Sequence, residues 1–304
     1  MLKSLTIYQI SEQAPTNPEN CQLAAEAEKS PIEISQTEKI YWASPYGHGN
    51  ERMVMACNGT IMMCVIKEQK LIPTAILNQS VNEQLSLIRY QENREPSKKE
   101  KAVLREKIFC EMSVKAFVKK QKINIVIDPS NSKLLIATTQ KALVDACLDL
   151  VYKTFPMLSL EQFNCNLPAS TAMTSWLKQK AMPYPFTLLN DCEFRNTEEN
   201  SVIKFKGVDL LSEDVLIHLN ENTLVQKMLL VHDEKMQFTL NADGSISGIK
   251  YLEYVQTEKA NIFTENLQAE LEADFLVSAD VISECLKSLV TALGGIVTAE
   301  EEMA

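Results

Sequence analysis

The stretch REPSKKEKAVLREKIFCEMSVKAFVKKQK, residues 94–122, decides the predicted fold because it contains a helix whose start is clearly marked. Pro96 interrupts any helix that precedes it. Ser97 and Glu100 then form a capping box, in which the serine hydroxyl accepts from the backbone N–H of Glu100 and the glutamate reaches back. We therefore predict a helix from there to about residue 114. Its inner face is expected to carry Val103, Leu104, Ile108 and Met112.

A second helix is predicted directly before this one, between Pro73 and Pro96. Proline is favoured in the first turn of a helix, where its missing N–H is not needed. Apolar residues then recur at helical spacing, namely Leu77, Val81, Leu85 and Ile88. The two helices would form a helical hairpin over residues 73–116.

This hairpin is expected to have one cationic side. Residues 94–122 hold ten basic and four acidic side chains, a net charge of +6, which leaves −16 for the rest of a chain whose total is −10. We expect the outer helix face and the residues after it to present Lys98, Lys99, Lys101, Arg105, Lys115, Lys119, Lys120 and Lys122. Such a row suits a phosphate backbone bound without sequence preference. The alternative is a solvated helix face, which is what most charge runs are.

The segments on either side of the hairpin have strand patterns. Residues 5–10 alternate, and residues 53–57 and 61–66 flank Asn58-Gly59, a strong hairpin signal because it tolerates positive φ. After the hairpin, residues 123–127 and 134–137 predict two paired strands. A helix over residues 140–152 should bury Leu143, Val144, Cys147, Leu148 and Val151. These signals indicate a β-β-α unit.

The C-terminal half is predicted to be mostly strands. Residues 159–200 are expected to be rich in loops, and strands are expected over 201–205, 224–231, 236–240 and 245–254. A final amphipathic helix over about 279–293 ends at Gly294-Gly295. The class is therefore α+β with mainly antiparallel sheet. We expect one unit, residues 1–304, with approximate sub-regions 1–72 (strands), 73–116 (basic helical hairpin), 117–158 (β-β-α unit) and 159–304 (strands and terminal helix).

Composition narrows the functional classes. No run approaches the roughly eighteen apolar residues of a membrane span, and the N-terminus resembles a strand and not a signal peptide. Eight cysteines without a C-x-x-C pair fit reduced, mostly buried thiols. We expect a soluble, cytoplasmic protein without a membrane partner. The three histidines make a histidine-built metal site improbable.

The search for catalytic residues yields only weak candidates. His48 lies between glycines and His232 precedes Asp-Glu, but neither has a second residue that would orient a general base. Polar loop roles are expected for both, and His218 is expected to be packed. Eight glycines leave little material for a phosphate loop. We predict no catalytic residue, metal, cofactor or small-molecule substrate, and a protein that is not an enzyme.

Motifs spread along the chain resemble those of one protein family. They include residues 3–11, Trp42 with Pro45 and Gly47, Asn58-Gly59, residues 67–73, Lys98 with Glu100, Lys101 and Leu104, and the tripeptide 115–117. Further along come Trp176, residues 209–214, Gln237-Phe238, residues 243–245, 273–275 and 292–295. Their collinear order over about 290 residues resembles the RdgC family.

The resemblance implies a ring-shaped homodimer of horseshoe subunits that encircles double-stranded DNA, associates with the nucleoid and restrains the RecA recombinase. Phe117 matches a phenylalanine at one dimer contact, with plain core packing as the alternative. Lys204 and Lys206 are assigned to DNA contact. The chain departs from the family where Gly207 and Val208 replace a Lys-Gln pair, and where Ser247 and Gly248 replace basic residues of some relatives.

Two other functional hypotheses stay open. The acidic remainder, with nine acids against one base from Glu265 onward, also fits an acidic interaction protein that inhibits a recombination partner by direct contact. An enzyme acting on DNA is the third, and it lacks a recognisable site.

Overall fold

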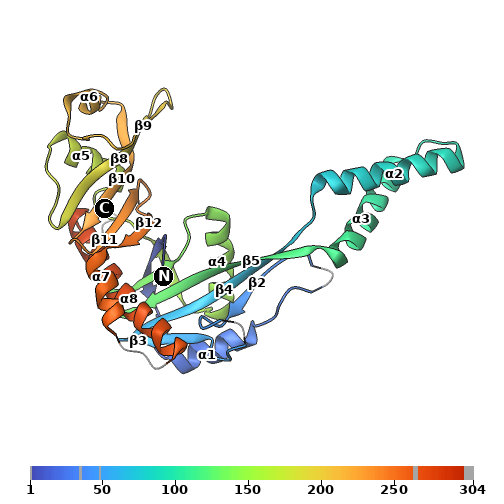
Figure 1. The fold of residues 1–304 in the computed structure, drawn as a ribbon, viewed down its shortest axis with the longest axis horizontal. Coiled ribbons are helices and arrows are strands. Elements are labelled where there is room, and N and C mark those ends of the chain that lie inside the picture. Colours follow the sequence, from blue (N-terminus) through green and yellow to red (C-terminus); the bar gives the residue numbers. More distant parts are fainter. Residues whose placement is uncertain (1, 34–35, 48, 263–265, 298–304) are drawn as a thin grey trace.

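The structure is a computed structural model that describes residues 2–33, 36–47, 49–262 and 266–297. Within these residues the chain forms two antiparallel sheets and eight α-helices, so the predicted α+β class with antiparallel sheets is confirmed. In Figure 1 the helical hairpin and the C-terminal sheet stand at opposite ends of the molecule, with the larger sheet between them.

The central sheet has seven strands in the order β2-β4-β5-β6-β1-β7, with β3 paired to β4. The strands are β1 (Thr6–Glu12), β2 (Glu38–Ala43), β3 (Val54–Cys57), β4 (Thr60–Leu71), β5 (Phe117–Asp128), β6 (Lys133–Ile136) and β7 (Ser159–Gln162). The turn between β5 and β6 contains the short 3-10 helix Pro129–Asn131. The predicted Asn58-Gly59 hairpin joins β3 to β4, with positive φ at both residues.

Both faces of the central sheet are buried over its middle. Alternate residues of β4 separate the two cores: Ile61 and Met63 pack with helices α1 (Pro18–Ala27) and α4 (Lys141–Thr154), whereas Met62 packs with the C-terminal half. This period of two is what a strand buried on both faces requires. In α4 the predicted core is confirmed, except that Leu150 is buried and Leu148 only half-buried.

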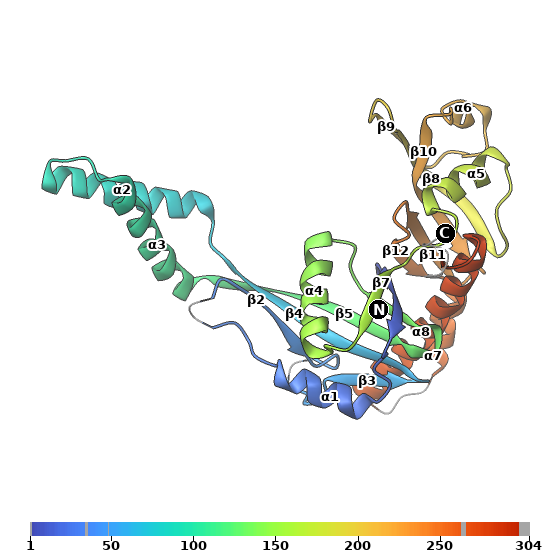
Figure 2. The same ribbon diagram turned by 180° about the vertical axis from the view of Figure 1, so that it is seen from behind.

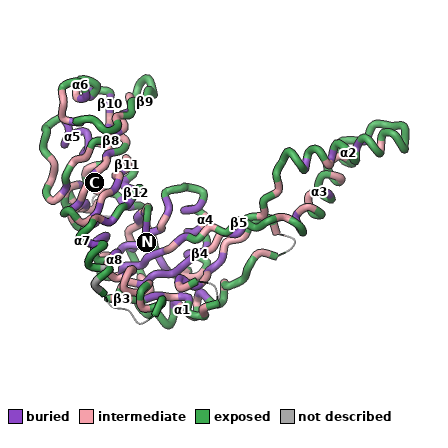
Figure 3. The backbone as a smooth tube through the Cα atoms, viewed as in Figure 1, coloured by how far each residue is buried: buried purple, intermediate pink, exposed green. Residues whose placement is uncertain are grey.

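The strands β4 and β5 extend past the sheet and carry the helical hairpin. They pair from Ile61↔Ile127 to Leu71↔Phe117, and the chain between their ends forms α2 (Thr74–Glu92) and α3 (Lys98–Lys115). The hairpin has a small core of its own in which Leu77, Val81 and Leu85 meet Ile108. Figure 3 shows that most of the hairpin is exposed. The predicted hairpin is confirmed, although β5 begins at Phe117 and not at residue 123.

The C-terminal sheet has five strands in the order β12-β11-β10-β8-β9. Its elements are β8 (Phe186–Asn196), β9 (Val202–Phe205), β10 (Thr223–His232), β11 (Met236–Asn241), β12 (Ile246–Tyr251), α5 (Ala169–Lys178), α6 (Glu213–Leu216), α7 (Glu253–Asn261) and α8 (Leu267–Ala292). Backbone hydrogen bonds between Leu5 and Ile246 connect it to the start of the chain. Figure 2 shows α8 running from this sheet toward β3.

Three predictions for the C-terminal half are wrong. Residues 159–200 are not mainly loops, because α5 buries Met173, Trp176 and Leu177 and β8 pairs with β10. The last strand ends at Tyr251, after which α7 begins. The terminal helix starts at Leu267, twelve residues early, where the Asn266 side chain accepts from the backbone N–H of Ala269 at 3.0 Å.

The cysteines largely follow the prediction. All eight are free: five are buried, Cys57 and Cys165 are intermediate, and Cys110 is exposed on α3. Burial raises the pKa of the Cys64 thiol to about 11 and that of Cys147 to about 12, so both stay protonated at neutral pH. Among the described residues, no helix is long and apolar enough to cross a membrane.

Candidate nucleic-acid interface

Helix α3 begins at the predicted capping box. The Ser97 hydroxyl accepts from the backbone N–H of Glu100 at 3.3 Å, and the Glu100 carboxylate accepts from the backbone N–H of Ser97 at 2.8 Å. Arg94 adds two hydrogen bonds to the same carboxylate, at 2.7 and 2.9 Å. The Arg94 guanidinium and the capping bonds lower the pKa of Glu100 to about 2. The positive charge of Arg94 is therefore neutralised by a carboxylate of the hairpin itself.

The cations of α3 fall into two groups. Lys101 lies 3.6 Å from the Glu95 carboxylate, and Arg105 donates to Asn78 Oδ1 on α2 at 2.6 Å. The sequence placed both on or near the outer face; Arg105 is exposed and Lys101 half-buried, and each is held by a neighbouring side chain of the hairpin. Both belong to the stripe that continues through Leu104, Ile108 and Met112, at helical spacing, and this stripe faces α2.

The outer face of α3 carries the other group. Lys98 and Lys99 are exposed, as predicted, and they are joined there by Lys107 and by Val103, which is 59% exposed. Val103 was predicted to face inward, but Phe109 packs on the hairpin core in its place. The side-chain ammonium groups of Lys98, Lys99 and Lys107 make no hydrogen bond or ion pair to a described residue. Lys107 was not among the expected contact residues, because Val103, four residues before it, was predicted to face inward; the exposed Val103 places Lys107 on this outer face.

The cationic row continues beyond α3. Lys115 is exposed at the end of the helix and Lys119 is exposed on β5, and neither side chain has a hydrogen bond or ion pair to a described residue. Lys120 and Lys122 alternate with Lys119 and point to the other face of the strand. There Lys122 donates to the backbone oxygen of Pro45 at 2.7 Å, and Lys120 is ion-paired.

The partner of Lys120 is the buried carboxylate of Glu68, at 2.7 Å. Glu68 also accepts from the Tyr41 hydroxyl at 2.9 Å and from the backbone N–H of Ile32 at 3.0 Å. Burial acts to raise the pKa of Glu68, but the bonds from Lys120, Ile32 and Tyr41 outweigh it and lower the pKa. Lys120 is therefore less free to meet a phosphate than Lys119.

Phe117 is not a core residue. Its side chain is 85% exposed at the start of β5, opposite Leu71, which is 48% exposed. Val114 and Val118, at 64% and 39%, extend this apolar surface along the chain. The alternative of plain core packing for Phe117 is thus wrong.

Lys204 lies on β9 and Lys206 directly follows that strand. In Figure 1, β9 stands at the opposite end of the molecule from the hairpin. Lys204 is on β9, at one edge of the C-terminal sheet, where Glu193 on β8 binds both Lys204 at 3.2 Å and Lys227 at 3.3 Å. Lys206 is exposed and has no partner among the described residues. The structure therefore does not gather the predicted cations at one place.

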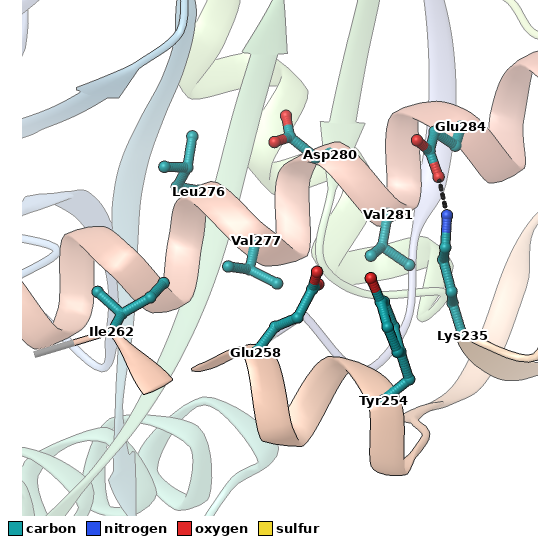
Figure 4. A pocket seen from close by; sticks show the side chains of 9 residues that line it. All are labelled: Lys235, Tyr254, Glu258, Ile262, Leu276, Val277, Asp280, Val281 and Glu284. Atoms are coloured by element: carbon teal, nitrogen blue, oxygen red, sulfur yellow. Dashed lines mark hydrogen bonds and ion pairs between the residues drawn. The ribbon is translucent and has the colours of Figure 1, made fainter. Parts of the chain in front are cut away.

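An acidic groove lies between α7 and α8 (Figure 4). This cavity of about 480 Å³ is lined by Glu258, Asp280 and Glu284, with Val277 and Val281 at its base. Among the described residues of its lining the one lysine is Lys235, which is ion-paired with Glu284 at 2.9 Å and with Asp233 at 3.0 Å. A phosphate backbone would be repelled here.

The histidine candidates show no catalytic arrangement. His48 lies outside the described residues. His232 is buried at the end of β10, not in the turn that follows, and its Nε2 lies 3.0 Å from Ser288 Oγ. His218, expected to be packed, is exposed beside the Phe205 ring. In the described part of the chain no group of three or more His, Cys, Asp or Glu side chains could hold a metal ion.

The chain is similar to a set of known proteins over almost its whole length. Residues 1–296 match the model of the family described as "Putative exonuclease, RdgC". Recombination-associated protein RdgC of Shewanella putrefaciens is 26% identical over 296 residues, 97% of both chains. The protein of the same name from Yersinia pestis is 24% identical over 295 residues, 96% of this chain and 97% of that one. On the full-length family match, the chain belongs to the RdgC family.

Proposed function

We propose that this protein binds double-stranded DNA without sequence preference through the basic hairpin surface, which we define as Lys98, Lys99, Lys107, Lys115 and Lys119. One observation carries the proposal: these five exposed ammonium groups follow each other along α3 and β5, and none is ion-paired to a described residue. An unpaired lysine releases a phosphate counterion when it binds, and this release drives non-specific affinity.

The net charge of −10 does not oppose this function, because the field at the hairpin is local. Charges farther apart than about 8 Å are strongly screened at physiological salt. The hairpin stands away from the acidic groove between α7 and α8 (Figure 1). Of its acids, Glu92, Glu95 and Glu100 are bound by Arg89, Arg94 and Lys101. Glu106 and Glu111 stay exposed on α3, but residues 94–122 still carry a net charge of +6. The outward field of the hairpin is therefore positive.

We further propose that two copies form a closed ring around the duplex, as the family resemblance implies. The exposed Phe117 with Leu71, Val114 and Val118 supports one contact, since a soluble chain rarely leaves such an apolar surface without a partner. A two-fold contact presents the same patch from each copy. The central sheet with its two outlying ends supports the horseshoe form of each subunit (Figure 1).

The relatives that match this chain are named for recombination. We propose that occupancy of duplex DNA by this protein, at the nucleoid, restrains RecA-dependent recombination, and that this restraint needs no catalysis. The family description includes the word exonuclease. Incubation of end-labelled duplex with the protein and Mg²⁺ tests it, and we expect the label to stay in full-length DNA.

The test of DNA binding compares charge-matched variants. The double variant Lys98→Glu/Lys99→Glu removes two cations of the basic hairpin surface. The control, Lys141→Glu/Lys250→Glu, makes the same charge change at exposed positions on α4 and β12. Fluorescence anisotropy with labelled duplexes of two unrelated sequences should show that the parent protein binds both with equal affinity. Only Lys98→Glu/Lys99→Glu should lose affinity, and the control should not. Equal losses in the two variants would mean that only total charge matters, and the hairpin would not be the site.

The acidic interaction protein remains a second candidate because of the groove in Figure 4. The variant Glu258→Gln/Asp280→Asn removes two of its charges without touching the hairpin. If inhibition of RecA strand exchange falls in this variant while duplex binding is unchanged, direct protein contact is the better account. Our proposal expects inhibition to follow duplex binding.

A further inference from the structure

A second cavity, of about 310 Å³, lies where the last turns of α8 meet the β5–β6 turn. Its polar wall holds Asn131, Lys133, Ser283, Lys287 and Thr291, with Asp128 beside them. Leu286, Val290 and Ile296 form an apolar wall. Small-molecule sites combine these features, an apolar enclosure with a few converging polar groups.

Lys133 is the unusual member of this lining. It is 4% exposed at the first position of β6, yet its ammonium group meets no carboxylate of a described residue within 4.0 Å. Its Nζ donates to Gln9 Oε1 and lies 4.9 Å from the centre of the Phe163 ring. An amide oxygen and a ring face are neutral partners, so the positive charge is not compensated by an adjacent anion.

Asp128, the cross-strand neighbour of Lys133, is committed to other bonds. Its carboxylate accepts from the backbone N–H of Asn131 at 3.2 Å and from Asn131 Nδ2 at 2.6 Å. That Asn131 amide also contacts Ser283 Oγ at 3.1 Å. Burial lowers the pKa of Lys133, against smaller opposing effects of Cys165 and Asp128. The distant carboxylate therefore does not replace an ion-pair partner.

A buried ammonium without a counter-ion is destabilising, because burial removes its hydration. An anion in the adjoining cavity would supply the missing partner. Lys287, exposed on α8, is a second cation at the same lining, and the Ser283 hydroxyl, which accepts from Asn131, can donate. Among its described residues, the lining holds two cations, Lys133 and Lys287, and one carboxylate, Asp128, which is already hydrogen-bonded to Asn131. Its net charge is therefore +1.

We infer that this cavity binds a small organic anion, with a carboxylate or phosphate head group at Lys133 and Lys287 and a short aliphatic body against Leu286, Val290 and Ile296. The inference is independent of DNA binding, because no residue of the cavity belongs to the basic hairpin surface.

The test is calorimetric titration of the full-length protein with butyrate, butyl phosphate, inorganic phosphate and butylammonium. We expect saturable binding of one butyrate or butyl phosphate per chain and none of butylammonium. Binding of one head group only would identify the class of ligand. Lys133→Met should weaken binding about tenfold or more, since hydrogen bonds to charged groups are the strong ones. Lys287→Met should weaken it less, and the exposed control Lys250→Met should leave it unchanged.

A second variant guards against loss of fold. Val290→Phe keeps both lysines but fills the cavity, and it too should abolish binding, with thermal melts and duplex binding showing that each variant is folded. Should no anion bind saturably at millimolar concentration, the inference is wrong. It is also wrong if butyrate affinity is unchanged in folded Lys133→Met protein, or if butyrate still binds to folded Val290→Phe protein.

Discussion

The Nζ atom of Lys120 lies 2.7 Å from Oε1 of Glu68, so an exposed lysine of β5 is bound to a carboxylate that is only 2% exposed. The same carboxylate holds Tyr41 on β2 and the backbone of Ile32. Glu68 thus connects the segment before β2 to the two strands that carry the hairpin. This arrangement gives Lys120 a structural role, whereas the neighbouring Lys119 side chain faces solvent.

Glu68 should make stability depend on pH. Its pKa is below the usual 4.5 in the folded chain, so its contribution is present above that pH and is lost as the pH falls through the folded value. Glu68→Gln should lower the free energy of unfolding by on the order of 1–3 kcal/mol at neutral pH, the loss expected for a buried hydrogen-bonded group. Urea unfolding of parent and variant should show this gap shrinking at about pH 3.5. If the difference in unfolding free energy between parent and variant stays constant with pH, the charge of Glu68 does not contribute as we propose. The control is Glu161→Gln, at an exposed position on β7.

The two groups of cations on α3 should differ in their effect on DNA. Lys98→Gln and Lys99→Gln each remove an unpaired charge, whereas Lys101 and Arg105 already contact Glu95 and Asn78. We expect each of the first two changes to reduce the salt slope of duplex binding by about 0.9, the value per phosphate contact. Lys101→Gln should change it by clearly less. Anisotropy titrations at several salt concentrations measure the three slopes. Equal changes of slope at Lys98, Lys99 and Lys101 would show that the ion pair between Lys101 and Glu95 does not affect DNA binding.

Glu193 should weaken contact with DNA at the C-terminal sheet. It binds Lys204 and Lys227, and burial and these two ammonium groups set its pKa, which is lowered overall. Glu193→Gln frees both lysines, so duplex affinity at low salt should rise and the salt slope should steepen by up to about 1.8. Unchanged affinity in this variant would place Lys204 outside the DNA path.

Phe117→Ala should leave the folded chain almost intact, because an 85% exposed side chain contributes little to the core. We expect the free energy of unfolding to change by less than about 0.5 kcal/mol. Association with DNA, which charge steers, should be unchanged. If Phe117 closes a ring, dissociation from closed circular duplex should quicken. Equal dissociation of parent and variant from circular DNA would argue against topological enclosure through this contact.

Local signals in the sequence predicted much of the fold. Asn58-Gly59 and the Ser97–Glu100 capping box are short motifs with fixed geometry, and both formed as expected. The helix α5 and the start of α8 were missed because tertiary packing defines them: Trp176 and Phe275 become buried only against the C-terminal sheet. The proline residues on either side of α5 suggested loops, but they only mark where the helix begins and where it has ended.

The candidate site was harder to predict than the fold. The charge count found the basic segment, but whether a lysine is free depends on what lies across from it. Glu68 is 52 residues from Lys120 in sequence and adjacent to it through β-pairing. Likewise, Lys133 could not be distinguished from a surface lysine until β1, β5 and α8 enclosed it. Such neighbours come from the topology and not from local pattern.

The central claim, that unpaired lysines of the hairpin bind duplex DNA, is tested most directly by the salt slope of binding. The measurement is duplex affinity between 50 and 200 mM salt, for the parent and for the variant Lys98→Gln/Lys99→Gln/Lys107→Gln/Lys115→Gln/Lys119→Gln. If the parent makes roughly six to ten phosphate contacts, its slope of log affinity against log salt should be about −5 to −9. We predict that the variant loses most of this slope while keeping the parent's melting temperature. A parent slope near zero, or a folded variant whose slope equals the parent's, would contradict the account.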